Sequence, residues 1–155
     1  MHIFTYEGLT VEEPYLSYWS TFTKLVYQEV ALDKLMGEVY VSFVGDLPGG
    51  LYGSTHNSND CIEIEIAMFD SEGNGIPVTQ IETTIAHEMI HAEQYLSGDL
   101  IQHGLVETEL GLHFKYSYLG KDYINPSISD RPWESIAYEL ESPVAKAASY
   151  KMRFI

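Results

Sequence analysis

The sequence predicts a single α+β domain over residues 1–155, in which a mixed or antiparallel twisted sheet of three to five strands packs on a central helix. Further helices are expected near the N-terminus and the C-terminus. Three observations predict this fold class. The length of 155 residues suits one domain, and an apolar content of 45% is enough for a hydrophobic core. Strand-like alternation and helix-like spacing of apolar residues also occupy separate segments of the chain.

The first third of the chain predicts a helix followed by strands. Residues 16–35 have apolar side chains at three- and four-residue spacings, which indicates a helix that ends at Gly37. Residues 38–45 are β-branched and aromatic, as is typical of a strand. Residues 46–50 have the composition of a turn, and residues 51–54 are a candidate for a short edge strand.

Strict alternation over residues 61–68 predicts a strand that is buried on one side only. The isoleucines face one way, and Glu63 and Glu65 face the other. The following residues 70–75 partly imitate a calcium-binding loop, with oxygen-bearing side chains at alternate positions and a glycine sixth. The twelfth position of such a loop should be glutamate, but here it is Ile81, so the segment favours a plain turn.

A second helix is predicted over residues 79–97, where Thr79 and Glu82 form a capping box and Gly98 is a stop signal. Its apolar stripe consists of Ile81, Ile85, Met89, Ala92 and Leu96. Residues 99–128 mix loop with one predicted strand at residues 113–118.

A last helical region starts near Asp130. We expect Pro143 to break or kink it, because proline lacks the amide hydrogen and clashes with the preceding turn.

The charge balance excludes two function classes. The chain has 8 Lys and Arg residues against 23 Asp and Glu residues, so its formal net charge is −15. Phosphates and anionic membrane surfaces would be repelled, and we expect neither a nucleic-acid nor a membrane partner. Between Lys34 and Lys115 there are 13 acidic residues and no Lys or Arg. This favours a solvated acidic surface, the alternative being a negative cleft that attracts cations and basic peptides.

The chain is expected to be a cytoplasmic protein. Its N-terminal residues are interrupted by Glu7, Glu12 and Glu13, so no basic leader is followed by an unbroken apolar stretch, and no segment is long enough for a bilayer. The lone cysteine, Cys61, excludes a disulfide-stapled scaffold. The oligomeric state is left open.

The segment from His87 to His91 is an H-E-x-x-H motif on the predicted second helix. Residues four apart share one helix face, so the two histidines can direct ring nitrogens at a single point. A Zn²⁺ ion there would lie about 2.0–2.1 Å from each nitrogen. Glu88 is rotated about 100° around the helix, which places its carboxylate beside the metal, where it can take a proton from a bound water.

A catalytic zinc site also needs a third protein ligand and an open position. The long metzincin pattern is absent, because Gln94 and Ser97 stand where it requires glycine and histidine. The remaining candidates are His103, His113, Glu107, Glu109, Glu134, Glu139 and Glu141. Glu134 fits best and Glu141 second, because a ligand should lie at the edge of a packed stripe near a helix start, beside a neighbour such as Trp133.

Two motifs, HEMIHAEQY at residues 87–95 and RPWESIAYELE at residues 131–141, resemble those of gluzincin-type zinc metallopeptidases. The chain looks closest to the very small members called minigluzincins and to short H-E-x-x-H proteins encoded by tailed phages, which would act in the host cell. The order of elements agrees over residues 38–142. The resemblance implies a zincin-like domain in which His87, His91 and Glu134 bind zinc and Glu88 is the general base.

This sequence departs from the family pattern at two points. His91 and Glu134 are 43 residues apart, a longer insert than in thermolysin-like enzymes. Ile136 stands where the Pro-Trp-Glu motif of the family often has a second acidic residue.

The function expected from these residues is hydrolysis of peptide bonds by a zinc-dependent metallopeptidase, through a metal-activated water with Glu88 as the general base. The partner would be a peptide or protein substrate, basic if the acidic stretch surrounds the cleft. The donor that stabilises the oxyanion is left open among Tyr138, Tyr123, His103 and His113.

Two alternatives have different chemistry. Peptide deformylases also use H-E-x-x-H with an upstream cysteine as the third ligand, so Cys61 keeps a deformylase-like amide hydrolase open, although a small buried side chain is the favoured interpretation of that residue. The chain could instead be a catalytically silent binding or regulatory protein, or an enzyme held latent by its C-terminal residues 149–155.

Overall fold

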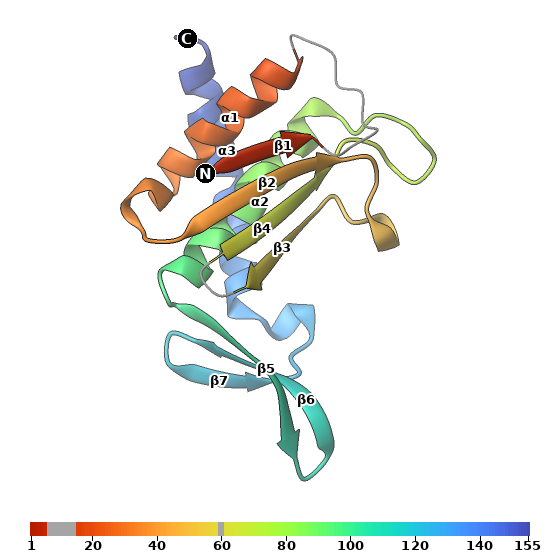
Figure 1. Ribbon diagram of the computed structural model, residues 1–155, viewed down its shortest axis with the longest axis vertical. Helices are drawn as coiled ribbons and strands as arrows, with labels where there is room; N and C mark the ends of the chain where they lie inside the picture. The colour runs from red at the N-terminus through yellow and green to blue at the C-terminus, as the bar shows by residue number, and fades with distance from the viewer. Residues whose placement is uncertain (6–14, 59–60) are drawn as a thin grey trace.

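The computed structural model describes residues 1–5, 15–58 and 61–155. Glu7, Glu12 and Glu13, on which the expected lack of a leader depends, lie outside these residues. The described elements are two sheets and three α-helices, so the predicted α+β class with a mixed sheet and helices near both ends is confirmed (Figure 1). Their order is β1 (His2–Thr5), α1 (Tyr15–Glu29), β2 (Glu38–Val44), β3 (Gly53–Ser58), β4 (Cys61–Ala67), α2 (Val78–Leu96), β5 (Leu100–Thr108), β6 (Gly111–Tyr118), β7 (Lys121–Ile124) and α3 (Pro132–Met152).

The larger sheet has the strand order β1-β2-β4-β3. Strands β1, β2 and β4 are parallel, and β3 pairs antiparallel with β4. Because β3 is last in this order, one of its edges has no strand partner among the described residues. The predicted edge strand therefore exists, but it spans Gly53–Ser58 instead of residues 51–54.

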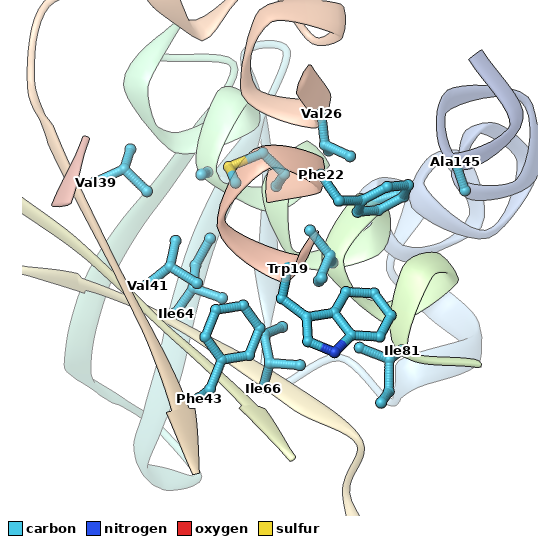
Figure 2. Close-up of a cluster of buried hydrophobic side chains, with 14 of the residues drawn as sticks. Trp19, Phe22, Val26, Val39, Val41, Phe43, Ile64, Ile66, Ile81 and Ala145 are labelled. Carbon is cyan, nitrogen blue, oxygen red and sulfur yellow. The ribbon is translucent and has the colours of Figure 1, made fainter. Parts of the chain in front are cut away.

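The hydrophobic core lies between one face of this sheet and the helices. Figure 2 shows side chains of β2 and β4 directed toward α1 and α2. Ile62, Ile64 and Ile66 are at most 1% exposed whereas Glu63 is exposed, so the one-sided burial predicted for this strand is confirmed. Trp19 and Phe22 of α1 contribute buried aromatic side chains to the same cluster.

The first helix ends earlier than predicted. Helix α1 stops at Glu29, and Ala31 has a left-handed φ of 62°. An α-helix cannot continue through that conformation, so the remaining predicted turn is a short 3₁₀ segment, Leu32–Lys34, followed by extended backbone at Leu35.

The predicted capping box of α2 is wrong. The helix begins at Val78 directly after Pro77, and no side chain caps it. Thr79 thus lies inside the first turn, where its backbone carbonyl accepts a hydrogen bond from Thr83 Oγ1 at 2.8 Å. Glu82 instead accepts a hydrogen bond from Tyr18 of α1 at 2.9 Å.

Helix α3 is continuous through Pro143, so the predicted break is wrong. Pro143 is exposed, while Ala145 and Ala148 just beyond it are buried in the core. Packing of the second half of the helix therefore offsets the backbone hydrogen bond that proline removes. The first turn of the same helix carries Glu134.

A second, three-stranded antiparallel sheet has the order β5-β6-β7. These three strands form in the segment 99–128, where the sequence predicted mostly loop and only one strand, at residues 113–118. Trp133 at the start of α3 packs on Tyr116, Tyr118 and Tyr123 of this sheet, with ring centroids 5.4–5.8 Å away. Figure 1 places the sheet beyond the β3 edge of the larger sheet.

None of the described helices combines the length and apolar character that crossing a bilayer requires.

Residues 70–75 form a turn, as the sequence predicted. Phe69 and Gly75 make an isolated antiparallel bridge. Asp70 Oδ1 accepts hydrogen bonds from the backbone amides of Glu72 and Asn74 at 3.0 and 2.9 Å, as in an Asx turn.

Candidate metal centre

Helix α2 brings its two histidines to one point, and α3 adds a carboxylate. The rings of His87 and His91 are perpendicular, with an interplanar angle of 86°, and their Nε2 atoms are 3.1 Å apart. Glu134 Oε2 lies 3.3 Å from His87 Nε2, and its Oε1 lies 3.2 Å from His91 Nε2. The three residues each offer one ligand atom, all within 4.8 Å of one another. This group is the ligand set expected from the sequence.

The outer ring nitrogens have partners that fix the orientation of both rings. His91 Nδ1 lies 2.8 Å from Gln94 Oε1, and Gln94 Nε2 donates to the Trp133 carbonyl at 3.0 Å. A carbonyl only accepts, so the Gln94 oxygen must face His91, and His91 Nδ1 must carry the hydrogen. Likewise, His87 Nδ1 lies 2.8 Å from the carboxylate of Glu141 and donates to it.

These hydrogen bonds leave the Nε2 atom of each neutral imidazole with its lone pair. Both lone pairs then face each other and the Glu134 carboxylate, which is also an acceptor. Three acceptors at this separation repel unless a positive charge lies among them. The donor set of two imidazoles and one carboxylate therefore fits a divalent cation, and the outer partners are those typical of metal-bound histidines.

The electrostatics of the group favour an anionic carboxylate at Glu134 and a basic imidazole at His87. Burial raises the pKa of Glu134, but hydrogen bonds and charge from the two histidines outweigh burial and hold the pKa well below its usual range. Burial lowers the pKa of His87, but its hydrogen bonds to Glu134 and Glu141 and the charges of Glu88 and Glu134 together outweigh burial, so the net pKa is raised. Without a metal, a proton on His87 Nε2 would therefore lie between this nitrogen and the Glu134 carboxylate.

Glu88 lies beside the ligands and is buried, with 7% of its surface exposed. Thr55 of β3 donates its hydroxyl hydrogen to Glu88 Oε2 at 2.5 Å. Burial raises the pKa of Glu88, and this outweighs the opposing effects of Thr55 and of the two histidines. A carboxylate with a raised pKa is a stronger base, as a group that must take a proton from water near neutral pH requires.

Gly53 allows strand β3 to approach Glu88 closely. A Cβ atom added at Gly53 would lie 2.7 Å from Thr84 Cγ2 and 2.9 Å from Glu88 Cγ. Sequence reasoning missed the contacts of Gly53 and Thr55, because no local pattern around these residues indicates which helix residue the strand faces. The only available signal was the predicted edge strand itself.

We expect Gly53→Ala to displace Glu88 and to lower any activity that depends on it by more than about tenfold, with a loss of stability of ~1–3 kcal/mol. The reason is that the strand, the Thr84 side chain or the Glu88 side chain must move to relieve these Cβ contacts. Gly45→Ala is the matched control, because a Cβ there meets nothing within 4 Å. Chemical denaturation and turnover assays would check both variants, and equal behaviour would contradict the close approach.

The ligands face a cavity of about 560 Å³, lined by β3, α2, the start of α3 and the second sheet. Tyr138 lines it, with its ring 4.7 Å from that of His87. The other three candidate oxyanion donors do not line it. Tyr123 packs on Trp133, His103 Nε2 lies 2.7 Å from Ser117 Oγ, and His113 Nε2 is buried with no hydrogen-bond partner among the described residues.

The other candidate ligands also lie outside the group. Glu107, Glu109 and Glu139 are exposed, and Glu141 contacts the outer nitrogen of His87 instead of the shared point. Cys61 begins β4 and neither belongs to the group nor lines the cavity.

Comparisons of the chain with profiles of known protein families, with curated proteins and with solved structures found no match.

Proposed function

We propose that the chain is a zinc-dependent metallopeptidase of the gluzincin kind, with His87, His91 and Glu134 as ligands and Glu88 as the general base. The observation that carries the proposal is the convergence of three acceptor atoms beside a buried glutamate at the wall of an open cavity. Imidazole nitrogens with one carboxylate are ligands that suit zinc, and three protein ligands leave a position for substrate or water. Bound zinc would polarise the scissile carbonyl and lower the pKa of water.

The residues of the chain supply the remaining steps. Glu88 takes the proton of the attacking water and later passes it to the leaving amine, with Thr55 holding the carboxylate in place. Tyr138 is the donor we assign to the developing oxyanion, because it alone of the four expected candidates lines the cavity. The edge of β3 that has no strand partner among the described residues suits an extended substrate backbone, which can pair with it as an added strand.

The geometry gives less support to the alternatives. A deformylase-like hydrolase would need Cys61 among the ligands, and Cys61 is outside the group. Latency through residues 149–155 would need that segment in the cavity, and none of its residues lines it.

The test of this proposal is metal content together with hydrolysis. Purified protein should contain close to one zinc per chain, measured by elemental analysis, and should cleave casein or members of a random peptide library. A chelator should stop cleavage, and added zinc should restore it. Zinc at full stoichiometry without cleavage of any peptide would instead favour the binding or regulatory alternative.

A further inference from the structure

Arg131 is a cation in the cavity wall that has no ion-pair partner among the described residues. It immediately precedes α3 and lines the same cavity as the candidate ligands. Its Nε donates to the Pro126 carbonyl at 3.2 Å, and its guanidinium lies 5.9 Å from the centre of the Tyr116 ring. None of the ion pairs between described residues includes it.

This isolation is unexpected in so acidic a chain. Three carboxylates line the cavity, those of Glu88, Glu134 and Glu141, and each has other partners. Arg131 is the one lysine or arginine among the described lining residues, although the chain has 23 acidic residues for its 8 basic ones. Its two terminal nitrogens therefore remain available to an anion that enters the cavity.

The side chain is also held in place. The hydrogen bond to Pro126 and the Tyr116 ring restrict the guanidinium, so little further freedom is lost when it binds a ligand. The backbone amide of Glu134 donates a hydrogen bond to the Arg131 carbonyl at 3.1 Å, so the two residues are neighbours at the start of α3. Its charge reaches other cavity residues, since it opposes the effect of burial that raises the pKa of Tyr95 to about 12.

We propose that Arg131 binds a carboxylate of the substrate, so that the peptides hydrolysed at this site carry a negative charge close to the scissile bond. This inference rests on the proposed function. The carboxylate is either the C-terminal carboxylate of a peptide or an aspartate or glutamate side chain, and both offer two oxygens to the planar fork of the guanidinium. The inference differs from the preference for basic peptides that the acidic stretch alone would favour.

The experiment measures binding separately from hydrolysis. Zinc-loaded Glu88→Gln protein is titrated calorimetrically with two pairs of acetylated tripeptides. The first pair is Ala-Leu-Ala with a free C-terminal carboxylate and the same peptide as an amide. The second pair, both C-terminal amides, ends in Asp or in Asn. We expect the charged member of one pair to bind about 10- to 100-fold more tightly, and that pair identifies the source of the carboxylate.

The preference should depend on Arg131. Arg131→Gln should abolish it, and Arg131→Lys, which keeps the charge but loses the fork, should retain only part of it. Arg153→Gln is the matched control, because it removes the same charge from an exposed position outside the cavity. If Arg131→Gln does not fold, two measurements still test the proposal. They are the binding of acid and amide peptides to the protein that retains Arg131, and the same comparison in Arg131→Lys.

Two outcomes overturn the inference: equal binding of acid and amide in both pairs, or a preference that survives in Arg131→Gln. In either case, peptide cleavage by the wild-type protein would leave the proposed function intact. Conversely, an Arg131-dependent preference for the charged peptide in a protein that cleaves nothing would support the carboxylate site and contradict the proposed peptidase activity.

Discussion

Glu88→Gln is expected to lower peptide hydrolysis by about 10²- to 10⁴-fold while zinc content and fold stay unchanged. The amide of glutamine has nearly the same shape as the carboxylate, and its oxygen can still accept the hydrogen bond from Thr55. It cannot take a proton from water, so only the base is lost. The measurements are kcat/KM on a cleaved peptide, zinc per chain and circular dichroism.

Glu93→Gln is the matched control for this substitution. Glu93 lies on the same helix, and burial also raises the pKa of its carboxyl, but it does not line the cavity. We expect its activity to remain within about twofold of wild type, as for a residue that touches no reacting group. Full activity in Glu88→Gln would show that another group acts as the base.

His91→Ala is expected to abolish stoichiometric zinc and with it all hydrolysis. His91 is buried and supplies one of three converging ligand atoms, and its removal also leaves Gln94 Oε1 without its partner. Loss of an outer partner of a metal-bound histidine typically weakens metal binding about 10- to 100-fold, and loss of the ligand itself should weaken it more. Elemental analysis after dialysis and competition with a chromophoric chelator would measure the change.

His56→Ala serves as the control for zinc binding. His56 lines the same cavity from β3, but it is exposed and lies outside the ligand group. Its replacement should leave zinc content unchanged. If His91→Ala retained one zinc per chain, the metal would have to bind outside the α2 site. That result would contradict the proposed function.

The sequence predicted those parts of the fold that depend on local pattern. Strict alternation identified β4, apolar spacing identified α2, and the H-E-x-x-H spacing placed two histidines on one face of it. Glu134, 43 residues further along the chain, could be chosen as the best candidate for the third ligand because it lies near a predicted helix start.

The features that the sequence did not predict depend on contacts between distant segments. Strand β1 has only four residues, too few for a periodic signal, and β5 contains an irregularity between Gln102 and Gly104 that interrupts its alternation. Pro143 was expected to break or kink a helix that core packing instead continues. The contact between Thr55 and Glu88 joins residues 33 positions apart on a strand and a helix, which no local pattern records.

The side-chain amide of Gln94 has a consequence for the molecule as a whole. One end of it holds His91, and the other end holds the backbone of Trp133, the residue on which three tyrosines of the second sheet pack. We therefore expect metal binding at the triad and attachment of that sheet to be thermodynamically linked through this buried amide. Whatever ion settles there should also tighten the wall of the cavity that faces an incoming chain.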